Sequence, residues 1–116
     1  MQVYDLERDG RREVREFIVG LDEGAQVRFW KTFRQLAQTG RAGREEQRFK
    51  HLDGPVYEIK EYSVSARIFC FRWKGCVIVC THGMQKPAGR GAGQYQEAIR
   101  KVKRLLKECE AAGVLP

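Results

Sequence analysis

The chain has 116 residues, 42% of them hydrophobic and 32% charged, with 22 Lys and Arg side chains against 15 Asp and Glu. This length supports one hydrophobic core and excludes a multidomain enzyme, and the composition is too apolar for a disordered tail. The net charge of +7 favours an anionic partner, nucleic acid before an acidic protein. The longest apolar run, residues 76–80, is far below the ~20 residues of a membrane span, and no secretory signal is visible, so we expect a soluble, cytoplasmic protein.

In chain order, the first half predicts a strand and two helices. Residues 1–6 alternate weakly, as a short strand does. A first helix follows, with Asp9 as its cap and an apolar stripe made of Val14, Phe17, Ile18 and Leu21. A second helix begins at Asp22 and ends at Gly40. Its apolar face, in which we assign Trp30 to the core, consists of Val27, Trp30, Phe33, Leu36 and Ala37.

The second half predicts three strands and a helix. Residues 56–62 alternate apolar and charged side chains, whereas 64–73 and 76–81 are apolar on both faces, as in a central strand that is covered on both sides. Lys74 and Gly75 form the turn between the last two strands. We predict an exposed loop over residues 39–46 and a mobile loop over the basic, glycine-rich residues 83–93. A helix with four apolar turns runs from Tyr95 to Cys109 and ends at Gly113, so residues 1–116 form a single α+β domain.

The positive charge is concentrated in the second half of the chain. Residues 1–61 carry twelve basic and twelve acidic side chains, whereas residues 62–107 carry ten basic side chains and the single acid Glu97. Five of these cations lie on the face of the last helix opposite its apolar stripe: Arg100, Lys101, Lys103, Arg104 and Lys107. This distribution predicts one phosphate-binding face.

Common catalytic patterns are absent from the sequence. There is no Gly-x-Ser-x-Gly elbow, no phosphate-binding glycine loop and no pair of carboxylates in an apolar context. The four cysteines form no Cys-x-x-Cys pair and the two histidines are far apart, so we expect neither a metal nor a cofactor. What remains is a series of cations on strands and adjoining loops, followed by Tyr95, which suits a phosphate site.

Three segments together resemble a known family. They are residues 51–60 (HLDGPVYEIK), 67–71 (RIFCF) and 81–86 (THGMQK), and residues 8–22 agree as well. The sequence resembles the RelE/ParE toxin superfamily, in particular its phage-derived, HigB-like branch. The resemblance implies the RelE-like microbial RNase fold, in which a small antiparallel β-sheet packs against an N-terminal helical hairpin, with a C-terminal helix and a concave basic face.

The resemblance also implies a function. Members of the RelE and HigB branches cut messenger RNA in the ribosomal A site without a metal ion, ParE members poison DNA gyrase, and each is neutralised by an antitoxin encoded beside it. We therefore expect a type II toxin that acts as a metal-independent, ribosome-dependent mRNA endoribonuclease and inhibits translation. Its partners would be mRNA on the ribosome, with contacts to ribosomal RNA, and a helix-turn-helix antitoxin. Two alternatives stay open: a ParE-like toxin of DNA gyrase that is no nuclease, and a phage-derived nucleic-acid-binding protein without catalytic activity.

Site residues follow from the resemblance by position. The implied catalytic residues are Lys60, Arg67, Lys86 and Tyr95, although Tyr95 also fits a core position at the start of its helix. Arg67 would neutralise the charge of the transition state, Lys60 or Tyr95 would act as the base, and Lys86 or Arg90 would steady the leaving group. The segment from Met84 to Pro87 departs from the pattern because it lacks one lysine. Glu58 stands where some RelE proteins have lysine, although Glu is usual in the HigB-like branch. Further RNA- or phosphate-binding residues are predicted at Arg48, Lys50, Arg72, Arg90, Arg100, Lys101 and Arg104.

Overall fold

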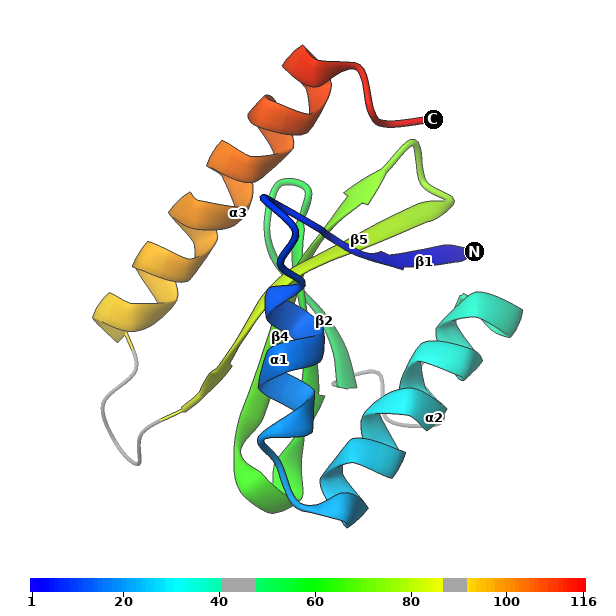
Figure 1. The fold of residues 1–116 in the computed structure, drawn as a ribbon, viewed down its shortest axis with the longest axis vertical. Coiled ribbons are helices and arrows are strands. Elements are labelled where there is room, and N and C mark those ends of the chain that lie inside the picture. The colour runs from blue at the N-terminus through cyan, green and yellow to red at the C-terminus, as the bar shows by residue number, and fades with distance from the viewer. Residues whose placement is uncertain (41–47, 87–91) are drawn as a thin grey trace.

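The computed structural model describes residues 1–40, 48–86 and 92–116, and it confirms the predicted α+β class (Figure 1). The five-stranded sheet has the order β1-β5-β4-β3-β2 and is antiparallel except for β1, which pairs parallel with β5. Its strands are β1 (Gln2–Asp5), β2 (Phe49–Asp53), β3 (Val56–Glu61), β4 (Ala66–Trp73) and β5 (Val77–Gln85). The helices are α1 (Glu13–Val19), α2 (Glu23–Thr39), the 3-10 turn η2 (Tyr62–Val64) and α3 (Ala92–Ala112).

Helices cover the sheet on both faces. On one face, α1 and α2 bury Ile18, Phe29 and Leu36 against apolar side chains of β3 and β4. On the other face, α3 buries Val102 against a cluster that includes Phe69 of β4. The central strand β4 is therefore buried on both sides, as its continuous apolar run predicts. No helix in the described part of the chain combines the length and apolarity that crossing a membrane requires.

The observed ends of the helices confirm some of the predicted capping residues and contradict one. The Asp22 carboxylate accepts a hydrogen bond from the backbone N–H of Ala25 and starts α2, and Gly40, with φ of 72°, ends it in the left-handed conformation. Gly113, with φ of 66°, follows the end of α3. The predicted cap at Asp9 is wrong, because α1 begins only after Arg12 and Asp9 lies in the preceding turn with φ of 52°.

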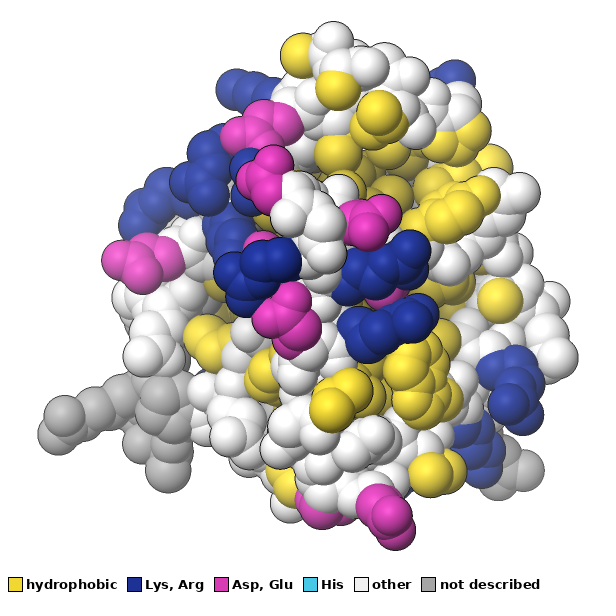
Figure 2. All heavy atoms as spheres, viewed as in Figure 1, with side chains coloured by type: hydrophobic (Ala, Val, Ile, Leu, Met, Phe, Trp, Pro, Cys, Tyr) yellow, Lys and Arg dark blue, Asp and Glu magenta, His cyan; other side chains and the backbone are white. Residues whose placement is uncertain are grey.

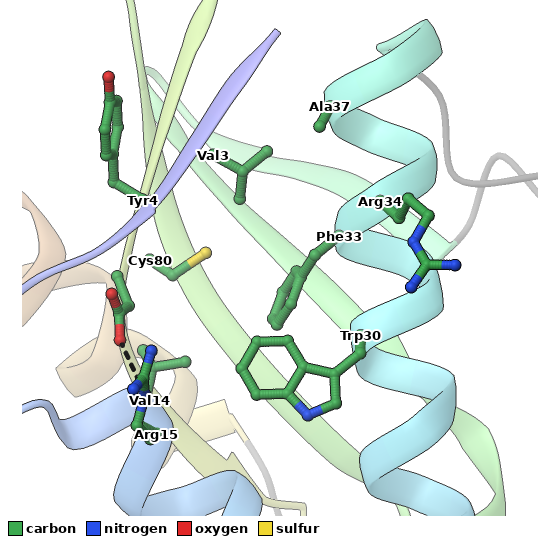
Figure 3. Close-up of a pocket in the computed structure, with 10 residues that line it drawn as sticks. Val3, Tyr4, Val14, Arg15, Trp30, Phe33, Arg34, Ala37 and Cys80 are labelled. Carbon is green, nitrogen blue, oxygen red and sulfur yellow. Dashed lines mark ion pairs between the residues drawn. The ribbon is translucent and has the colours of Figure 1, made fainter.

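The buried face of α2 differs from the predicted one. It contains Ala25, Phe29, Thr32 and Leu36. Val27 is 64% exposed and Trp30 is 43% exposed, so the assignment of Trp30 to the core is wrong. Figure 3 shows its indole beside Phe33 and facing β1, where both rings line an open cavity of about 330 Å³ between β1, α1 and α2.

The strand pattern is also corrected in three places. Strand β2 was not expected from the sequence, and β4 begins at Ala66 because residues 62–64 form the 3-10 turn. The predicted loop at 83–93 is wrong at both ends, since β5 continues to Gln85 and α3 begins at Ala92. Residues 87–91, and residues 41–46 of the predicted exposed loop, lie outside the described residues.

Candidate active site

Two cations face each other across the β3–β4 ladder. Lys60 of β3 is the register partner of Arg67 of β4, and partners in a ladder project from the same face of the sheet. Phe69 and Phe71, which alternate in phase with Arg67, pack toward α3, so both cations lie on the α3 side. Each of the two residues is only 8% exposed.

A buried carboxylate lies beside this pair. Glu58 is 2% exposed, and its Oε1 lies 3.8 Å from Lys60 Nζ while its Oε2 lies 4.0 Å from Arg67 Nε. The Oε2 atom has no hydrogen-bond partner within the described residues. Buried charges of opposite sign stabilise one another, whereas an orphaned buried acceptor costs free energy. The carboxylate therefore balances the cations and keeps one acceptor oxygen available.

Tyr95, in the first turns of α3, completes the contact with Arg67. Arg67 donates from Nε to the Tyr95 hydroxyl at 3.0 Å and from Nη1 to the Ala66 carbonyl at 3.1 Å. Burial raises the pKa of Tyr95 to about 12, the nearby Glu58 carboxylate adds to this rise, and Arg67 opposes it. At neutral pH the hydroxyl keeps its proton, so Tyr95 is suited to donate a hydrogen bond rather than to act as a base.

Lys86 joins this group from the end of β5. Its Nζ lies 5.5 Å from the centre of the Tyr95 ring, a cation–π contact. The structure thus brings together all four residues that the resemblance implies as catalytic, and adds Glu58 to them. We call these five residues the Arg67 cluster: Glu58, Lys60, Arg67, Lys86 and Tyr95.

The remaining predicted cations are dispersed. Lys50 of β2 is the register partner of Glu58 of β3, so it projects from the same face as the Arg67 cluster. Arg48 directly precedes β2. Arg72 lies five residues beyond Arg67 on β4, roughly 16 Å along the strand. Its guanidinium donates to the Gly75 carbonyl and lies 5.9 Å from the ring centre of Tyr57, which packs on the opposite face of the sheet.

The predicted phosphate-binding cations of α3 are exposed or pair with α1. Arg100 and Arg104 are exposed, and in Figure 2 basic side chains follow α3 along the left edge of the molecule. Lys101 forms an ion pair with Glu13 of α1 at 2.8 Å. Arg90 lies outside the described residues. Of the seven predicted phosphate-binding cations, the structure therefore brings Lys50 to the face of the Arg67 cluster, while Arg72, Arg100 and Arg104 point elsewhere.

A groove of about 340 Å³ lies between the end of β5 and the start of α3, lined by His82, Met84, Gln94 and Lys101 among others. Met84 is the register partner of Arg67, so the groove adjoins the Arg67 cluster. Burial lowers the pKa of His82 to about 4, and the charge of Lys101 adds to the effect. His82 is therefore neutral at physiological pH, and it stacks on Phe69 with ring centres 5.1 Å apart.

Sequence reasoning missed two residues of this region. The family pattern marks Glu58 only as a position where some RelE proteins have lysine, and it assigns no role to Tyr62. Tyr62 lies over both cations, with its ring centre 5.5 Å from Lys60 Nζ and 5.9 Å from Arg67 Cζ. In the strand predicted over residues 56–62, the period of two would put residues 58, 60 and 62 on one face, and this signal could have found both.

Comparisons with known proteins identify the family and the fold of the chain. Residues 16–107 match the sequence model of the family described as "Phage derived protein Gp49-like (DUF891)". The fold is similar to the crystal structure of the isolated RelE toxin of E. coli, with 16% sequence identity and a TM-score of 0.53 over 88% of this chain and 99% of that chain. Among curated protein sequences, none matches. The family match and the fold confirm the predicted resemblance to the RelE/ParE toxin superfamily.

Proposed function

The chain belongs to the family of phage-derived Gp49-like proteins, and from this premise we propose that it is the toxin of a type II toxin-antitoxin system. Its activity is the metal-independent cleavage of messenger RNA on the ribosome, which stops translation. A helix-turn-helix antitoxin neutralises it. The RelE-like fold supports this proposal, and the observation that carries it is the position of Arg67.

Arg67 is held in place for phosphate chemistry. Its guanidinium is fixed by the Tyr95 hydroxyl and the Ala66 carbonyl, and Lys60 lies directly opposite. A planar guanidinium meets two phosphate oxygens at once, and burial strengthens its interaction with charge that develops on a phosphorane. Arg67 therefore stabilises the transition state, and Lys60 adds a second positive charge.

The proton transfers are assigned to the other members of the Arg67 cluster. Attack by the ribose 2′-hydroxyl on the adjacent phosphate requires a group that accepts the hydroxyl proton. Glu58 is the carboxylate of the cluster, and its Oε2 has no hydrogen-bond partner within the described residues. Tyr95 keeps its proton and donates a hydrogen bond to the phosphate, while Lys86 stabilises the leaving 5′-oxygen. Because this chemistry needs a 2′-hydroxyl, it acts on RNA and leaves DNA intact.

A pair of arginines on one strand provides the test. The Arg67→Ala variant should lose growth arrest on expression and lower message cleavage by about 10²- to 10³-fold, the usual effect of removing a group that stabilises developing charge. Arg67→Lys, which keeps the charge but loses the planar fork, should fall in between. The matched control is Arg72→Ala on the same strand, which should cut like the wild type. Cleavage is mapped by primer extension with and without ribosomes, and thermal unfolding checks that each variant is folded.

Three outcomes would contradict the proposal. Cleavage by Arg67→Ala at the wild-type rate would exclude Arg67 as the residue that stabilises the transition state. Growth arrest with intact messages and a DNA-damage response would favour the gyrase toxin. Expression of the wild type without any growth defect would favour a nucleic-acid-binding protein without catalytic activity.

A further inference from the structure

Tyr62 is an exposed aromatic side chain beside buried cations. The residue is 42% exposed, whereas Lys60 and Arg67, which lie against its ring, are each 8% exposed. Tyr4 and Trp30 are also large exposed aromatic residues in the described part of the chain, but they line the cavity next to β1 and α2. Tyr62 is thus the exposed ring that borders the Arg67 cluster.

The turn that carries Tyr62 is fastened on both sides. The Glu61 carboxylate accepts from the backbone N–H and the hydroxyl of Ser63 at 3.0 and 2.8 Å. Arg28 of α2 forms an ion pair with Glu61 at 3.0 Å and donates to the Ser63 hydroxyl at 2.6 Å. These contacts tie the 3-10 turn to α2, so the backbone that carries the Tyr62 ring is held in position before any ligand arrives.

The other end of the turn is fixed to the sheet. Ser65 adopts the left-handed conformation with φ of 51°, and its backbone N–H donates to the Tyr62 carbonyl. Its carbonyl accepts from the backbone N–H of Lys86, a member of the Arg67 cluster. A side chain that is already ordered loses little conformational entropy when it binds, which strengthens binding.

An exposed ring next to phosphate-binding cations suits one kind of ligand. In single-stranded nucleic acid, bases and phosphates alternate along the chain, and proteins bind it with cations for the backbone and aromatic rings for the bases. We infer that Tyr62 is a stacking platform for a nucleobase of single-stranded RNA whose neighbouring phosphate lies at Lys60 and Arg67. The inference rests on the proposed function only for the choice of RNA as the ligand.

Binding of an RNA that cannot be cut tests this inference separately from catalysis. The probe is a fluorescently labelled single-stranded 2′-O-methyl oligoribonucleotide. The control ligand is an abasic oligomer of the same length and charge. Affinities are measured by anisotropy at one fixed low salt concentration for four proteins: the wild type, Tyr62→Leu, Tyr62→Phe and Tyr4→Leu. Tyr4 is a matched control, because it is 47% exposed on β1 and its hydroxyl donates to Gln2 of the same strand.

The expected result is selective for the base. Tyr62→Leu should weaken binding of the oligoribonucleotide by roughly 5- to 150-fold, the range found for stacking aromatic residues, and leave binding of the abasic oligomer unchanged. Tyr62→Phe keeps the ring and should stay within about twofold of the wild type, as should Tyr4→Leu.

Each other result overturns the inference. Equal losses for both oligomers would mean that Tyr62 only orders the cations, and no loss, or no binding of either oligomer by the wild type, would mean that no base stacks there. Failure of the proposed function looks different. In that case the wild type leaves messages uncut on ribosomes, while the effect of Tyr62→Leu on the uncleavable oligomer persists.

Discussion

Gly83 of β5 lies directly against the Phe17 ring of α1. A Cβ atom at this position would lie 2.2 Å from Cδ2 and 2.4 Å from Cγ of Phe17. Carbon atoms in ordinary contact are about 3.5–4.0 Å apart, so the Phe17 ring would have to retreat by roughly 1.3–1.8 Å. The obstructing atoms belong to the stem and edge of a half-buried ring, which cannot rotate out of the way. We therefore predict that Gly83→Ala displaces α1 from β5.

The size of the effect follows from this overlap. Overpacking by one methyl group costs about 1–3 kcal/mol, and the short distances at Gly83 place the substitution at the upper end, about 3 kcal/mol. With an unfolding entropy of about 2.1 cal/mol/K per residue, a loss of this size lowers the melting temperature of a 116-residue domain by about 12 °C.

Thermal and urea unfolding measure this loss against a matched control. At Gly93 in α3 an added Cβ meets no heavy atom of the described residues within 4 Å, so Gly93→Ala should be neutral or stabilise the protein by up to about 1 kcal/mol through helix propensity. The double variant Phe17→Leu with Gly83→Ala should lose less than the sum of the two single variants, because the smaller side chain makes room. A melting temperature of Gly83→Ala within about 2 °C of the wild type would refute the reasoning.

Three further predictions concern the Arg67 cluster and its surroundings. Glu58→Gln should reduce message cleavage by about 10²- to 10⁴-fold, as expected for loss of a general base, while urea unfolding still shows a folded protein; cleavage at the wild-type rate would exclude Glu58 as the base. Burial alone would raise the pKa of Glu61, but hydrogen bonds from Ser63 and Arg28 lower it below its ordinary value of 4.5. The stability that this carboxylate contributes is therefore present above about pH 4.5 and lost as the pH falls through the lowered value, and Glu61→Gln should make the urea midpoint less dependent on pH in this acidic range. Finally, Trp30→Ser should cost at most about 1 kcal/mol and Phe29→Ala about 3–5 kcal/mol, since only Phe29 is buried; similar losses in urea unfolding would contradict the position of α2.

Apolar patterns predict the strands that are buried. Strands β3 and β4 can be predicted from the sequence because both are largely buried. Burial requires apolar side chains at alternate positions in β3 and along nearly all of β4. Strand β2 cannot be predicted in this way, because it lies at the edge of the sheet with three of its five residues exposed, and such a strand has the composition of a loop. The end of β5 is hidden for a different reason. Gly83 is a turn signal in sequence, but here glycine is required by the ring of Phe17.

The orientation of α2 depends on its neighbours. Its sequence contains apolar residues on more than one side, so that the stripe through Val27 and Trp30 is as regular as the buried stripe through Phe29 and Leu36. Thr32 lies in the buried face because its hydroxyl donates to the Arg28 carbonyl in the same helix, which satisfies the polar group locally. Periodicity therefore predicts the helix and its ends, and the packing against β1 and β3 decides which side is buried.

Part of the candidate site can be predicted from the sequence. The family pattern identifies Lys60 of β3, Arg67 of β4, Lys86 just after β5 and Tyr95 of α3, and the fold brings these four residues together. Strand periodicity alone would have added Glu58. The contact of Tyr95 with Arg67 depends on where α3 crosses the sheet, and no local pattern encodes this crossing.

The separation of charge along the chain does not persist in three dimensions. Acids of the neutral first half fold onto the basic second half: Glu13 pairs with Lys101 at 2.8 Å and Asp53 with Lys103 at 2.6 Å. The opposite charges of each pair cancel one another within a few ångströms, and salt screens the field of the remaining charges beyond about 8–10 Å. A count of cations therefore overstates the electrostatic field that a distant RNA would meet. Within the Arg67 cluster, burial has the opposite effect, because a lower local dielectric strengthens each contact with a phosphate. The net charge therefore points to an anionic partner, whereas the position of its cleavage would be set by a few buried groups.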